Sequence, residues 1–443
     1  MKIPNLVLST IILFISNIIV RCFGFIYKIF LSNAMGETAL GVYHMIFNFL
    51  MVCIALTTTG IPTALSCLIS NKHTLKDKKD TSIYFISTLY MSFLISFIIS
   101  LFVSFKSAEI SAKFFNDENL NLFVLSICPA IVIITISNVL RSYFYGIKKV
   151  KVPAIGQIIE QICKMLFVIL LVLYINDKAM ICYIALLGIS IGETTNVIFM
   201  SICLYKENSL YNKFTVKLKD FYTSSVATLK MAIPITCNRM SSVVLQSVSS
   251  MIIPSRLCLS GMTHIQAMGV YGVIGGMVMP FVYLPFTIGS ALVVNLIPSL
   301  SQEVTLNKYS NVIEKIKFAL VLTLVVGIAS SIFYYFAGEK LCYMVFHNKN
   351  AGTYLKAMSL APLFLSLNQT LSSILHSIRK EVIASVNTIL GMVIQFILIY
   401  LLLPIPNLNI YAYIYAVTVT SIFTTICHSV VLIRALKKLK VRR

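Results

Sequence analysis

Charged side chains inside long apolar stretches are the residues of this sequence that could do chemistry. Arg21 and Arg239 lie near the middle of two such stretches, and Lys28 lies nearer the end of the first. A charge at the centre of a spanning helix costs about 2.5–3.5 kcal/mol on insertion scales, so each needs a partner, a water-filled cavity or a function. Because a guanidinium stays ionised and donates two parallel hydrogen bonds, arginine suits a phosphate group. These three residues are therefore candidates for binding an anionic substrate.

Four other charged residues form a second candidate set. Glu160 and Lys164 are four residues apart, which places them on one helix face where they can pair with each other. Glu193 is central in its apolar run and has no partner there, while Arg141 lies nearer a helix end, where it can extend to the membrane surface. A structural ion pair and coupling to a proton or cation are both open for this set. Salt bridges from the two mid-span arginines to these carboxylates are the alternative to substrate binding.

The sequence carries no signature of an enzyme or of a metal site. We find no nucleophile–base pair, no phosphate-binding loop and no metal-ligand cluster. The eleven cysteines are mostly isolated in apolar runs and have no metal-ligand spacing. We therefore expect no catalytic residue, no metal and no cofactor. Transport by such a protein could be coupled to Na⁺, to H⁺ or to the membrane potential.

The elements that must position these charges are membrane-spanning helices. The chain is 58% hydrophobic and 12% charged, with a mean hydropathy of +0.90, whereas soluble domains are about 25% charged. A spanning helix needs about 20 apolar residues, so 443 residues leave room for about a dozen. The apolar runs predict an all-α polytopic membrane protein with spans at 6–31, 40–70, 82–104, 119–146, 152–176, 180–204, 223–253, 268–300, 312–337, 354–378, 381–403 and 409–434.

The net charge of +21 lies in loops, which argues against a nucleic-acid partner. Basic clusters occur on alternate connections, near residues 2, 72–79, 148–151, 206–219, 308–317, 379–380 and 437–443. This alternation follows the positive-inside rule. It predicts a multi-pass protein of the plasma membrane with an even number of spans and both termini in the cytoplasm.

An internal repeat divides the chain into halves. Gly41-Val42-Tyr43 recurs as Gly269-Val270-Tyr271, and motifs in 140–149 recur at nearly the same offset in 371–380. We therefore predict two parallel six-helix lobes, 1–222 and 223–443. Transporters built from parallel repeats hold their substrate near the membrane midplane.

Many segments resemble the SpoVB-like (stage V sporulation protein B) branch of the multidrug/oligosaccharidyl-lipid/polysaccharide exporter superfamily, which includes MATE, Wzx and MurJ proteins. The segments are 21–32, 60–66, 141–146, 157–162, 192–193, 232–239, 253–254, 271–277 and 297–301. The resemblance implies a V-shaped central cavity and a flippase or exporter of undecaprenyl-pyrophosphate-linked saccharides or peptidoglycan precursors, in sporulation for this branch. The partners would be the lipid-linked anionic saccharide, the lipid bilayer and cell-wall synthesis proteins.

By the same resemblance, Arg21 matches an arginine of the cationic cavity in relatives, and Lys28 falls where a basic residue is usual. SpoVB and MurJ proteins usually carry two further helices after the twelfth, and this chain stops at Arg443. A MATE-type cation or drug antiporter is an alternative function, although four predicted spans expected to line its cavity (6–31, 40–70, 223–253 and 268–300) hold no carboxylate. A non-transporting scaffold for cell-wall synthesis is another.

Overall fold

The computed structural model describes residues 5–58, 60–74, 78–115, 117–206, 218–285, 300, 309–378 and 380–441, and this part of the chain contains helices and no strand. The end of the predicted span 268–300 lies outside it. The longer helices are α1 (Asn5–Thr58), α2 (Ile61–Thr74), α3 (Lys78–Phe105), α5 (Asn121–Gly146), α6 (Lys151–Val172), α7 (Lys178–Lys206), α8 (Leu218–Leu259), α11 (Tyr309–Phe346), α13 (Ala361–Ser377), α14 (Glu381–Leu402) and α15 (Tyr411–Val441). Shorter elements are α4 (Ser107–Phe114), η1 (Glu118–Leu120), α9 (His264–Gly272), the π-helical η2 (Val273–Val278) and α12 (Lys349–Ala357).

The helices confirm the predicted fold class. Ten stretches of the described residues are long and apolar enough to cross a membrane. The first of them, Ile15–Ser70, contains most of the predicted span 6–31 and all of 40–70. Between these two spans Gly36 breaks α1 with a φ of 71°, which glycine adopts without strain. The predicted span 354–378 corresponds to α13, which has only 17 residues. Each of the twelve predicted spans therefore contains a helix.

The chain forms two compact units. The first contains Met1–Met35 and Val42–Ser247, and the second contains Gly36–Gly41 and Val248–Arg443. The unit boundary lies inside α8, because the first half of α8 bonds to α3 of the first unit: Ser224 Oγ donates to Ser87 Oγ over 2.8 Å. The predicted lobes 1–222 and 223–443 differ from these units and stay a prediction.

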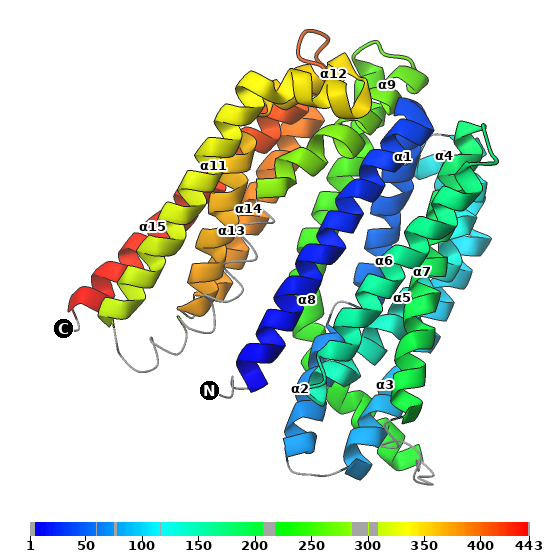
Figure 1. Cartoon of the computed structure of the whole chain (residues 1–443), viewed down its shortest axis with the longest axis vertical. Helices are drawn as coiled ribbons and strands as arrows, with labels where there is room; N and C mark the ends of the chain where they lie inside the picture. The colour runs from blue at the N-terminus through cyan, green and yellow to red at the C-terminus, as the bar shows by residue number, and fades with distance from the viewer. Residues whose placement is uncertain are drawn as a thin grey trace. The chain divides into compact units, whose positions relative to one another are not determined.

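The cores of the two units follow the sequence repeat. Four buried residues with the same spacing lie in each core, the last of them directly after the helix: Leu140, Tyr143, Phe144 and Ile147 for α5, and Leu371, Ile374, Leu375 and Ile378 for α13. These positions are equivalent under the offset of 231 residues that relates 140–149 to 371–380, which we call the repeat offset. Each of these helices is followed by a helix of 22 residues, α6 in the first unit and α14 in the second. The helices of each unit can be followed in Figure 1.

The short helix α4, outside the candidate spans, carries a surface ion triad. Glu109 accepts from Lys106 and Lys113 over 2.7 Å each. The hydrogen bonds from Lys106 and Lys113 lower the pKa of Glu109 to about 2. Since its folded-state pKa is depressed, the contribution of the ionised form is present at neutral pH and is lost only as the pH falls through about 2. Glu109 and Lys113 therefore serve as controls for charge changes inside the membrane.

Candidate functional site

Three charged residues from three helices meet inside the first unit. The helices α5, α6 and α7 lie side by side (Figure 1) and carry Arg141, Glu160 and Glu193 respectively. Arg141 Nη2 lies 3.5 Å from Glu160 Oε2 and 3.9 Å from Glu193 Oε2. The three side chains are only 12–19% exposed. One guanidinium thus faces two carboxylates in a poorly solvated place, where breaking such a pair costs about 3–5 kcal/mol.

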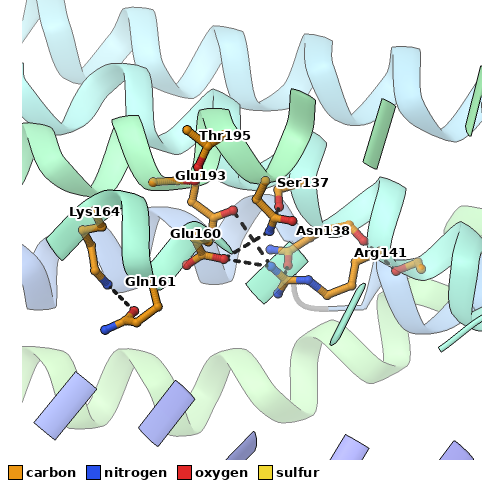
Figure 2. A network of polar contacts seen from close by, with 11 residues as sticks. Ser137, Asn138, Arg141, Glu160, Gln161, Lys164, Glu193 and Thr195 are labelled. Atoms are coloured by element: carbon orange, nitrogen blue, oxygen red, sulfur yellow. Dashed lines mark hydrogen bonds and ion pairs between the residues drawn. The ribbon is translucent and has the colours of Figure 1, made fainter. Parts of the chain in front are cut away.

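Neutral polar side chains complete this ion cluster, which we define as Arg141, Glu160 and Glu193. Asn196 of α7 is fully buried, and its Nδ2 donates to Glu160 Oε2 over 3.1 Å and to Ser137 Oγ over 3.2 Å. Arg141 Nη1 donates to Asn138 Oδ1 one turn earlier on α5. Figure 2 shows both carboxylates directed at the Arg141 guanidinium. The cluster therefore links α5, α6 and α7 through hydrogen bonds as well as charge.

Lys164 does not make the ion pair with Glu160 that the sequence predicts. Its Nζ donates to Gln161 Oε1 over 2.7 Å, and it lies 5.4 Å from the centre of the Tyr27 ring of α1. In Figure 2 Lys164 is turned to Gln161, away from the carboxylates. Arg141, another member of the predicted ion-pair set, instead supplies the guanidinium that faces both carboxylates. Spacing on one helix could not predict this partner for Glu160, because it comes from another helix.

Glycines allow α6 and α7 to approach closely enough to form the cluster. A Cβ on Gly192 would lie 2.9 Å from the Glu160 carbonyl oxygen and 2.9 Å from Lys164 Cβ. A Cβ on Gly156 would lie 2.3 Å from Asn196 Oδ1. Because a side chain at either position would collide with the facing helix, the two glycines allow α6 and α7 to pack closely.

We predict that Gly192→Ala destabilises the protein by about 1–3 kcal/mol, the usual cost of overpacking. The added methyl would push α7 away from the backbone of Glu160, which cannot move aside as a side chain can. Thermal unfolding in detergent measures the change. Gly24→Ala is the control, since its Cβ would make an ordinary 3.5 Å contact with Gln161 Nε2; equal melting temperatures for the two variants would contradict the prediction.

The cationic face of α1 lies beside the same part of α6. Arg21, Gly24 and Lys28 share one face of α1 by helical spacing, and a Cβ on Gly24 would lie 3.5 Å from Gln161 Nε2 of α6. The side chains of Arg21 and Lys28 are exposed in the structure. Lys164 of α6 lies 5.4 Å from the ring centre of Tyr27, the residue before Lys28. The first unit therefore gathers basic groups from α1 and α6 near one another.

The structure thus brings together six of the seven predicted site residues in one unit. For the seventh, Arg239, the backbone lies in the part of α8 that belongs to this unit, and its side chain lies outside the described residues. Sequence reasoning missed Asn196, Gln161 and Tyr27; a polar residue in an apolar run was the available signal for the first two. Within the described residues, no group of three or more His, Cys, Asp or Glu side chains could hold a metal ion.

The fold is that of a known class of transporters. Over 97% of this chain and 99% of the other, the structure resembles the inward-facing conformation of a multidrug resistance MATE family transporter of the MOP superfamily, with a TM-score of 0.72 and 14% sequence identity. The family described as polysaccharide biosynthesis protein matches residues 6–303. The chain therefore belongs to the polysaccharide biosynthesis protein family.

Two curated relatives from Bacillus subtilis (strain 168) cover most of the chain. Stage V sporulation protein B is 24% identical over 95% of this chain and 82% of the relative. Lipid II flippase MurJ is 22% identical over 89% of this chain and 76% of the relative. The resemblance stated from the sequence segments is confirmed by this family and these relatives.

Proposed function

We propose that this protein is a flippase that moves an undecaprenyl-pyrophosphate-linked saccharide or peptidoglycan precursor across the plasma membrane by alternating access, in sporulation, the process named in its relative stage V sporulation protein B. Membership of the polysaccharide biosynthesis protein family and the relative named as a lipid II flippase support the substrate class. The fold shared with a MATE family transporter supports the mode of movement. Transport, not catalysis, is the proposed activity.

The observation that carries the proposal is the excess of basic groups in the first unit. Arg21 and Lys28 present cationic side chains on one exposed face of a helix long and apolar enough to span a membrane. Such charges are expensive in a bilayer unless they meet water or an anion. A pyrophosphate carries negative charge on each phosphoryl group and accepts hydrogen bonds from both cations, so it compensates this cost.

The orientation that we propose follows from the loops. Basic clusters occur near residues 148–151 and 437–443, on the side that the positive-inside rule assigns to the cytoplasm. Both termini then lie in the cytoplasm, and Arg21 lies within the first span. Partners among the cell-wall synthesis proteins would bind from either aqueous side.

Reconstitution tests the proposed function. Purified protein in liposomes is expected to move fluorescent lipid-linked saccharide pyrophosphates between leaflets, whereas a neutral polyprenol-linked saccharide should stay in place. Depletion in a host cell should accumulate a lipid-linked precursor on the cytoplasmic leaflet. Absence of movement by protein that is folded and inserted in both orientations would refute the flippase.

A cation or drug antiporter of the same fold is the second candidate, and the two partly buried carboxylates of the cluster favour it. Such proteins need carboxylates that are available to a cationic substrate. Here both carboxylates face Arg141, and basic residues outnumber acidic ones around them. Uptake of a cationic dye into the same liposomes, driven by a proton or Na⁺ gradient, would favour this candidate over the flippase.

A further inference from the structure

The second unit makes the helix contact equivalent to that of α6 and α7 without charges. Under the repeat offset, Gly391 of α14 stands for Glu160, and Thr424 of α15 stands for Glu193. A Cβ on Gly391 would lie 2.3 Å from Thr424 Oγ1, so the two positions touch. The remaining equivalents are also uncharged: Ser372 for Arg141 and Gln395 for Lys164. The equivalent contact in the second unit is therefore made by small neutral residues, and the ion cluster is a feature of the first unit.

The charges of the first unit do not balance. Its predicted spans near the cluster hold four basic residues, Arg21, Lys28, Arg141 and Lys164, and the two acidic residues Glu160 and Glu193. Basic residues therefore outnumber acidic ones in these spans. An anion such as a pyrophosphate diester would reduce this excess of positive charge.

Arg141, and not Lys164, faces the two carboxylates of the ion cluster. Arg141 lies next to both carboxylates. Lys164 donates a hydrogen bond to the neutral side chain of Gln161 and lies over the ring of Tyr27. Among the described residues, neither Lys164 nor Lys28 lies within ion-pair distance of a carboxylate. An amide oxygen and an aromatic ring orient an ammonium group without cancelling its charge. Lys164 is therefore held by Gln161 and by Tyr27, the residue before Lys28, and not by an ion pair with either carboxylate.

We propose that Lys164 is a further contact of the anionic headgroup, and that Arg141 is a positioning residue that keeps Lys164 available by occupying Glu160 and Glu193. This inference rests on the proposed function, because it assigns the pyrophosphate to Lys164 and Lys28 together. Without Arg141, Lys164 would turn to Glu160, its neighbour one helical turn away, and the headgroup would lose a cation.

Binding to purified protein in detergent tests the role of Lys164. The probe is undecaprenyl pyrophosphate, with undecaprenol as the uncharged reference. Lys164→Gln is expected to weaken binding of the pyrophosphate about tenfold, as for the loss of one hydrogen bond to a charged group, and to leave undecaprenol unaffected. Lys113→Gln on α4 is the matched control and should bind like the unmodified protein, because Lys113 pairs with Glu109 outside the spans.

A rescue experiment tests the positioning role of Arg141. Arg141→Gln should weaken pyrophosphate binding about as much as Lys164→Gln does, since both remove the Lys164 contact. Adding Glu160→Gln and Glu193→Gln to Arg141→Gln removes the competing carboxylates, so the triple variant should bind within about threefold of the unmodified protein. Thermal unfolding checks that each variant is folded.

The outcomes separate this inference from the proposed function. If the unmodified protein does not prefer undecaprenyl pyrophosphate to undecaprenol, the proposed function fails and the inference fails with it. If it does prefer the pyrophosphate but Lys164→Gln binds equally well, the inference alone is overturned. A triple variant as weak as Arg141→Gln, though folded, would overturn the positioning role of Arg141.

Discussion

Alanine at Arg21 is expected to lower the rate of substrate translocation at low substrate concentration at least about 30-fold, the lower end of what truncating one member of a buried charge pair costs. Arg21 supplies a guanidinium from the middle of the first span, and a water molecule in its place would not compensate the charge of a phosphate. Arg239→Ala should have an effect of similar size if both arginines hold the headgroup. Translocation in liposomes, scored at matched protein content, measures both.

Two controls sharpen this prediction. Arg21→Lys keeps the charge but loses the planar fork, so it should retain an intermediate rate. Glu109→Gln removes a charge from the surface triad of α4 and should leave translocation unchanged. Normal flipping by both alanine variants would rule out the proposed anion contacts, even if the protein proves to be a flippase.

The helices were predictable from the sequence because their signal is local. A run of apolar residues predicts a span whatever it packs against, and all twelve predicted spans contain a helix. The repeated motifs in 140–149 and 371–380 likewise mark equivalent buried positions of α5 and α13. Hydrophobic pattern and repetition therefore gave the fold class and the correspondence between the two units.

The partners of the charges could not be predicted in the same way. The i,i+4 spacing indicates that Glu160 and Lys164 can meet, but it cannot say that α5 presents Arg141 to the same carboxylate. That choice depends on how α5, α6 and α7 are rotated and how closely they pack, which Gly156 and Gly192 help to set. The unit boundary inside α8 is similar, since it follows from contacts such as Ser224 with Ser87 and not from loop length.

A second large effect is expected from Gly272→Leu, in the contact between α9 and residues 36–41 of α1 within the second unit. A Cβ on Gly272 would lie 2.0 Å from the Glu37 carbonyl oxygen and 2.6 Å from the Gly41 backbone nitrogen. A Cβ on Gly41 would in turn lie 2.1 Å from the Met268 carbonyl oxygen. The two backbones touch on both sides, so no flexible side chain can move aside to accept a larger residue.

We therefore expect Gly272→Leu to destabilise the protein by about 3 kcal/mol or more, at or above the upper end of the usual overpacking cost. The yield of monodisperse protein and its thermal unfolding measure the effect. Gly269→Ala is the matched control, one turn earlier on α9, since its Cβ would meet the Glu37 and Thr38 side chains only at 3.6–3.8 Å. The repeated motifs that begin at Gly41 and Gly269 therefore lie in segments that contact each other. Substitution should lower the stability most at glycines whose Cβ would collide with backbone atoms. If Gly272→Leu melts like Gly269→Ala, this close backbone contact does not exist in the protein.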